Sequence, residues 1–133
     1  MAGAATVEIK VKVTGLGDTV ESENSVTMTV PVEVQKGYTV LATATTTGLQ
    51  LFDLVDHIAL AKIYGVYIKA VVGTVYITVD TAGTDTLTAA TADLVLNVGE
   101  ACYLPINPAG NLVLVVDGSA VTAAIEWMIL GKA

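Results

Sequence analysis

The chain begins with strict alternation of apolar and polar positions. In the run TVEIKVKVT, residues 6–14, every second residue is apolar and the residues between them are charged or polar. The apolar positions are Val7, Ile9, Val11 and Val13. Because successive side chains of a strand point to opposite faces, this period of two predicts a strand with one covered face and one wet face. Residues 1–5 precede it as an N-terminal segment that we expect to be flexible.

Alternation returns in SVTMTVPVEV, residues 25–34, after the polar segment GLGDTVESEN, which predicts a solvated loop over residues 15–24. The positions expected to face inward are Val26, Met28, Val30, Val32 and Val34. Pro31 cannot donate to a strand ladder, so it indicates an edge strand or a bulge at that point. The run KGYTVLATATTT, residues 36–47, predicts a third strand because threonine suits a pleated surface.

The middle of the chain is mostly strand as well. GLQLFDLVDHIAL, residues 48–60, predicts a short strand followed by a loop or a single helical turn. YGVYIKAV and TVYITVD predict a hairpin with its turn at residues 72–74. A loop of small polar residues, TAGTDTLTAATAD, separates them from the short strands LVLNV and ACYLPI.

These elements together predict the fold class. About eight to ten short strands, with turns every 8 to 12 residues or so and no sustained helix, are typical of an all-β protein. We expect an antiparallel β-sandwich that is jelly-roll-like. With 133 residues and neither an internal repeat nor a linker, the chain is expected to form a single sandwich domain over residues 1–133.

The last two apolar runs, NLVLVV and AVTAAIEWMIL, flank an Asp-Gly turn and predict a final hairpin, which raises the question of what covers its second face. The expected core positions of the final run are Val121, Ala123, Ile125, Trp127 and Ile129. The remaining positions are too apolar to face water, so either the second sheet and the loops cover them or another subunit does. The low charged fraction, 14%, favours a subunit in a closed symmetric oligomer. The predicted oligomer or partner interface consists of Leu112, Leu114, Val116, Met128 and Leu130.

Charge argues against two kinds of partner. The chain has six lysines, no arginine and 13 acidic residues, which gives a net charge of −7. Phosphate backbones are bound through lysine and arginine, so we expect no nucleic-acid partner. The apolar window at residues 58–79 contains Lys62 and Lys69, each costly at the centre of a membrane helix, so we expect no membrane span there.

Candidate catalytic groups are sparse. His57, preceded by two nearby aspartates, is the one histidine of the sequence, so no two-histidine metal site is possible and a catalytic pair is unsupported. No serine stands in a GxSxG turn, and Cys102 is alone. The loop between Asp80 and Asp85 lacks the dense ligand ladder of a calcium site. We therefore expect no enzyme activity, no catalytic residue, no bound metal and no cofactor.

Aromatic residues leave one alternative open. A sugar-binding sandwich would need aromatic rings grouped on one exposed face, and Tyr64, Tyr67 and Tyr76 are the candidates. Tyr64 lies on the opposite parity from Tyr67, so at most part of this group is expected to face one way.

Residues 48–130 resemble the small β-sandwich virion proteins of tailed bacteriophages. The resemblance rests on a Leu-x-x-Gly-Glu turn formed by Leu96, Gly99 and Glu100, on a short penultimate strand, and on a last strand that ends in Glu-aromatic-apolar residues at 126–130. It implies a jelly-roll-like structural protein of the capsid decoration or cement type that acts by contact and without catalysis.

The resemblance also implies partners and a location. Such a protein is made in the host cytoplasm and ends in the virion, at the capsid surface. It is expected to form a homo-oligomer, with a homotrimer favoured, and to stabilise the shell by bridging neighbouring subunits of the major capsid protein or other virion proteins. The alternating first strand is a candidate for strand addition to a neighbour. The alternative is a tail, neck or head-fibre component with a receptor- or carbohydrate-binding β-sandwich.

Overall fold

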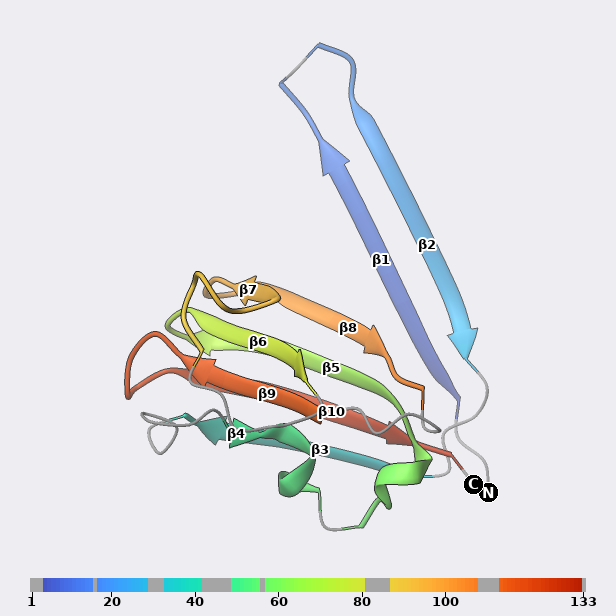
Figure 1. Ribbon diagram of the computed structural model, residues 1–133. Helices are drawn as coiled ribbons and strands as arrows, with labels where there is room; N and C mark the ends of the chain where they lie inside the picture. The colour runs from blue at the N-terminus through green and yellow to red at the C-terminus, as the bar shows by residue number, and fades with distance from the viewer. Residues whose placement is uncertain are drawn as a thin grey trace. The chain divides into compact units, whose positions relative to one another are not determined.

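The computed structural model describes residues 4–15, 17–28, 33–41, 49–55, 57–80, 87–107 and 113–132. The chain divides into two compact units, Met1–Val32 and Glu33–Ala133. The first unit is a two-stranded hairpin, and the second is a sandwich of two four-stranded sheets (Figure 1).

The hairpin consists of β1 (Ala5–Val13) and β2 (Val20–Met28), which pair antiparallel over their whole length. Ala5 lies opposite Met28 at one end of the ladder and Val13 lies opposite Val20 at the other. Gly15 and Gly17 in the connecting turn have positive φ, a conformation that glycine adopts without steric cost. The loop predicted over residues 15–24 is therefore too long, because residues 20–24 belong to β2.

In the described part of the chain, eight strands form the sandwich, four in each sheet. The first sheet has the order β3 (Glu33–Val40), β10 (Ala124–Gly131), β5 (Ile63–Val72) and β8 (Ala101–Pro105). The second sheet has the order β4 (Leu49–Gln50), β9 (Val113–Gly118), β6 (Val75–Asp80) and β7 (Leu94–Leu96). Within each sheet, the neighbouring strands pair antiparallel.

This strand order is a jelly roll. Among the described strands, consecutive ones lie in different sheets except β6 and β7, so the chain crosses from one sheet to the other at nearly every connection. The expected all-β, antiparallel and jelly-roll-like sandwich is thus confirmed. The short strand and helical turn expected after residue 48 are also present, as β4 and the 3-10 helix η1 (Leu51–Leu54), with a second 3-10 turn at η2 (Leu60–Lys62).

The crossing pattern corrects two predicted hairpins. β5 and β6 are consecutive but lie in opposite sheets, and the turn at Gly73, with φ of 70°, carries the chain between them. β9 and β10 likewise lie in opposite sheets. The two strands of each pair therefore contribute to the core from opposite sheets, whereas the strands of a hairpin lie side by side in one sheet.

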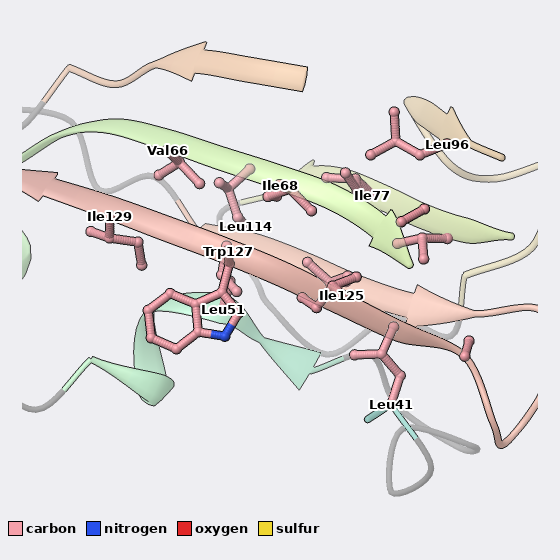
Figure 2. Close-up of a cluster of buried hydrophobic side chains, with 14 of the residues drawn as sticks. Leu41, Leu51, Val66, Ile68, Ile77, Leu96, Leu114, Ile125, Trp127 and Ile129 are labelled. Atoms are coloured by element: carbon pink, nitrogen blue, oxygen red, sulfur yellow. The ribbon is translucent and has the colours of Figure 1, made fainter. Parts of the chain in front are cut away.

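The core lies between the two sheets (Figure 2). Trp127, Ile125 and Ile129 enter it from β10, Ile68 from β5 and Ile77 from β6. The predicted core parity of the last run is confirmed from Ala123 to Ile129, whereas Val121 precedes the strand and is exposed. All members of the core cluster belong to the second unit: Leu41, Leu51, Ile58, Ile63, Val66, Ile68, Ala70, Val75, Ile77, Leu96, Leu114, Val116, Ala123, Ile125, Trp127 and Ile129.

The expectation of one sandwich over residues 1–133 needs correction. The described sandwich strands begin at Glu33, and β1 and β2 pair with each other rather than with a strand of either sheet. None of the described residues of the hairpin belongs to the core cluster. Of the segment expected to be flexible, residues 1–3 lie outside the described residues, and Ala5 already belongs to β1.

Candidate functional site

The predicted interface on NLVLVV is wrong for two of its three residues. Leu114 and Val116 have no exposed surface and belong to the core cluster. In the ladder with β6, Val116 lies opposite Ile77, which is also fully buried. These side chains already lie against the other sheet and are not available to a neighbouring subunit. Leu112 lies outside the described residues.

The second face of β9 is covered by the chain itself. Val115 and Asp117 point to that face, and both are buried although they face away from the core. The segment after β6 contributes to the cover: the buried Leu87 donates its backbone N–H to Asp117 Oδ2 at 3.4 Å. The segment after β6 therefore helps to cover the face of β9 opposite the predicted interface residues Leu114 and Val116.

Asp93 anchors the same segment to β6. Its Oδ2 accepts hydrogen bonds from the Thr78 hydroxyl at 3.1 Å and from the Val79 backbone N–H at 2.9 Å. The Asp93 backbone N–H donates to the Ile77 carbonyl at 3.0 Å. Buried Thr78 thus has a partner, as a buried hydroxyl requires.

Met128 and Leu130 lie on the outer face of the first sheet. Met128 has Lys36 and Tyr67 as its neighbours across the ladders, and Leu130 has Val34 and Gly65. Met128 is half-buried and Leu130 is buried, so of the five predicted interface residues Met128 keeps the most surface among those described. Val34, expected to point inward, is exposed because its register with Leu130 places it on this outer face.

Tyrosines gather on the same outer face. Tyr67 on β5 lies directly opposite Tyr103 on β8, and the Tyr103 ring lies over Gly65, where a Cβ would clash with it. Burial raises the pKa of Tyr103, and the nearby Tyr64 raises it further. Tyr76 lies on β6 in the other sheet. The predicted aromatic trio is therefore divided, and Tyr103, which the sequence did not single out, replaces Tyr76.

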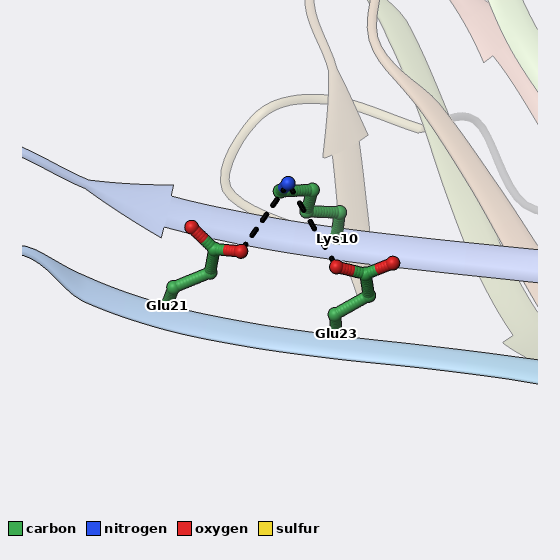
Figure 3. A network of polar contacts seen from close by, with 3 residues as sticks. All are labelled: Lys10, Glu21 and Glu23. Atoms are coloured by element: carbon green, nitrogen blue, oxygen red, sulfur yellow. Dashed lines mark ion pairs between the residues drawn. The ribbon is translucent and has the colours of Figure 1, made fainter.

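The hairpin unit has two chemically different faces. Cross-strand neighbours share a face, so the register places Lys10 with Glu23 and Lys12 with Glu21 on the polar face. Lys10 Nζ lies 3.2 Å from Glu21 Oε1 and 3.7 Å from Glu23 Oε2 (Figure 3). All three side chains are well exposed, so these ion pairs add little stability.

The opposite face of the hairpin is apolar, and its large side chains are exposed. Its exposed apolar side chains are Ile9, Val11, Val13, Val20 and Val26, with exposed fractions between 40% and 66%. Large apolar side chains contiguous over such a length usually mark a contact surface. The alternation in the first strand predicts one covered face, and within the hairpin the apolar side chains of that face are exposed.

Reactive groups are few in the part of the chain that the structure describes. It contains no group of three or more His, Cys, Asp or Glu residues that could hold a metal ion. His57 is exposed, and burial raises the pKa of the half-buried Cys102 thiol. Across those same residues, no helix has the length and apolar character needed to cross a membrane.

Comparisons with known proteins return no match: no protein family, no curated protein and no solved structure is significantly similar to the chain.

Proposed function

We propose that this chain is a non-enzymatic virion structural protein of a tailed bacteriophage, a capsid decoration or cement protein. In this role it oligomerises, with a homotrimer favoured, and bridges neighbouring subunits of the capsid surface. The observation that carries the proposal is the division of the chain into a sandwich with its own core and a hairpin with an exposed apolar face. A body that folds by itself, joined to an element that lacks a partner, is the layout expected of a protein that acts by assembling.

The jelly roll supports the proposal at the level of fold. Double-sheet jelly rolls occur in viral capsid proteins, lectins and cupins. Fold alone does not assign function, so each alternative has to be judged by its site. The cupin alternative requires several histidine ligands, and the sequence has a single histidine.

Charge distribution also suits assembly. The net charge of −7 keeps free copies apart before they dock. Docking then requires surface without charge, because a desolvated unpaired charge would oppose binding. In the hairpin strands the register places the charged side chains on one face and leaves the other face free of them.

The proposed role follows from these parts. A closed oligomer presents several copies of the same capsid contact, so weak individual contacts combine into strong attachment. Each attached oligomer links neighbouring capsid subunits and resists their separation when internal DNA pressure strains the shell. The jelly-roll sandwich, whose core is complete, supplies a rigid link between those contacts.

The proposal is tested on assembled particles. Phage particles from cells that express this gene with its neighbouring genes are separated on a density gradient, and the chain is detected by mass spectrometry. We expect it in the particle fraction, and we expect particles made without it to release their DNA at a lower temperature. Recovery of the chain solely as free protein at the top of the gradient would contradict the role.

The tyrosines of the first sheet favour a second candidate, a carbohydrate-binding component of a tail, neck or head fibre. Tyr67 and Tyr103 lie side by side on the outer face, and aromatic rings of this kind stack against sugars. A glycan array tests this candidate with Tyr67→Ala and with Tyr76→Ala, a matched change on the other sheet. Sugar binding that is lost with the first substitution and kept with the second would support it, and an array without hits would exclude it.

A further inference from the structure

We propose that the apolar face of the β1–β2 hairpin is the self-association surface of this protein, and that other copies of the same face cover it. We call this surface the hairpin face. The inference deepens the proposed function, and it rests on the oligomer that this function requires. It places that oligomer's contact on the N-terminal hairpin, whereas the sequence placed it on the last two apolar runs.

The register defines the hairpin face. On β1, each odd-numbered residue from Ala5 to Val13 lies on it, and the cross-strand partners on β2 are the even-numbered residues. The described side chains of the face are Ala5, Val7, Ile9, Val11, Val13, Val20, Ser22, Asn24 and Val26. Seven of these nine are apolar, and none of the nine is charged.

The hairpin face needs a cover. A two-stranded hairpin by itself is marginally stable in water, because it buries too little apolar surface to offset the loss of chain entropy. The central side chains Ile9 and Val11 are 51% and 58% exposed. Burying them in an assembly would stabilise the hairpin and the contact together.

Charge favours a second copy as the occupant. The chain is strongly acidic, so repulsion opposes contact between two copies least where the surfaces that meet carry no charge. The charged residues within the two strands, Glu8, Lys10, Lys12, Glu21 and Glu23, all lie on the opposite face. A partner that recognised this acidic protein by charge would use that polar face, whereas the hairpin face suits an uncharged partner such as itself.

Two polar residues at the centre of the hairpin face also favour a second copy over a purely apolar partner. Ser22 lies opposite Val11, and Asn24 lies opposite Ile9. A purely apolar partner would leave both side chains without hydrogen bonds, at a cost. Asparagine is both donor and acceptor, so when identical faces meet at a symmetry axis, the Asn24 side chains of different copies satisfy one another.

The dimensions fit such an arrangement. Nine residues at about 3.4 Å each give a face about 30 Å long. Apolar sheet faces stack about 10 Å apart with their side chains interdigitated, which suits valine and isoleucine. Such a face is smaller than a standard interface of about 800 Å² per partner, so we expect an oligomer that dissociates on dilution.

Light scattering coupled to size-exclusion chromatography tests the inference on the full chain. Asn24→Asp changes the side chain least in size and places like charges together at the axis. Val11→Asp places a charge beside the central apolar residues. The matched control is Thr27→Asp, which adds the same charge to the same hairpin on its polar face, opposite the uncharged Thr6.

We expect the wild type and Thr27→Asp to form the same oligomer. Asn24→Asp should raise the dissociation constant at least about tenfold, and Val11→Asp should leave a monomer. Circular dichroism of each variant should retain the β-sheet spectrum, because the sandwich core lies outside the hairpin. A wild-type monomer, or an oligomer that survives both face substitutions, would overturn the inference.

The same variants separate this inference from the proposed function. If the wild type oligomerises through the hairpin face but is absent from particles, the inference holds and the capsid role fails. If the chain is found in particles and both face variants still oligomerise, the capsid role stands and the inference fails.

Discussion

The indole ring of Trp127 lies over Gly37, its neighbour across the ladder between β10 and β3. A Cβ at residue 37 would collide with the ring, so glycine is required for the close approach. The indole N–H donates to the Thr39 hydroxyl at 3.1 Å, which pairs the one polar atom of this core side chain. One glycine and one threonine on an edge strand therefore position the largest side chain of the core.

Gly37→Ala should destabilise the sandwich. The added methyl group forces Trp127 out of its place, and overpacking of this kind costs about 1–3 kcal/mol of the free energy of unfolding. Urea denaturation followed by Trp127 fluorescence measures the change, because the sequence has a single tryptophan. The control is Lys36→Ala on the exposed face of the same strand, which should change stability by less than about 0.5 kcal/mol. Equal stability of Gly37→Ala and the wild type would contradict this packing.

Thr39→Val should cost about 1–3 kcal/mol, because it retains the shape of the side chain but leaves the Trp127 N–H without its acceptor. Thr39→Ser keeps the hydroxyl and should be closer to the wild type. The same denaturation curves report both variants. An equal loss of stability in Thr39→Val and Thr39→Ser would show that the hydroxyl group does not stabilise the sandwich.

Local alternation predicted much of this fold. Every second residue of β1 and of β10 is apolar, and the parity from Ala123 to Ile129 gave the correct core face. Parity does not say which sheet a strand joins. Read as one hairpin, the last two runs predict Leu114 and Val116 at a subunit interface. In the structure β9 and β10 lie in opposite sheets, and both side chains belong to the core.

Two further features depend on contacts distant in sequence. The cover over β9 involves a hydrogen bond between Leu87 and Asp117, and no pattern near either residue indicates that they meet. Tyr103 joins Tyr67 because β8 pairs with β5, a register that alternation does not reveal. By contrast, the sequence itself shows the apolar stripe of the first strand. The structure adds that this strand belongs to a separate hairpin, in which the apolar side chains are exposed.

Asp117→Ala should loosen the segment that covers β9. Asp117 Oδ1 accepts from the Gly118 N–H at 2.7 Å and Oδ2 accepts from Leu87, so the alanine variant removes both acceptors. We expect a loss of about 1–3 kcal/mol in stability and faster amide hydrogen exchange at residues 87–93. Asp117→Asn, which keeps one carbonyl acceptor, should show a smaller effect. Unchanged exchange in the alanine variant would mean that other contacts hold the segment.

Stability should fall at alkaline pH, in part because of Cys102. Burial raises the pKa of its thiol above the ordinary value of 9.0, so the unfolded chain loses this proton at a lower pH than the folded chain does. The stability that the protonated thiol contributes is fully present below about pH 9, and it is lost as the pH rises through the pKa of the thiol in the folded state. Urea midpoints between about pH 7 and pH 10 should fall more steeply for the wild type than for Cys102→Ala. Both proteins retain Tyr64 and Tyr103, so the titration of these tyrosines affects both curves alike. Parallel curves would contradict a buried thiol.

The central claim is that the sandwich is complete by itself and that the hairpin makes the assembly. The most direct test compares the mass in solution of the full chain with that of a chain consisting of residues 33–133. We expect the full chain to be an oligomer and the shortened chain to be a folded monomer with a cooperative unfolding transition. A full chain that stays monomeric at high concentration, or a shortened chain that still forms the oligomer, would contradict the claim.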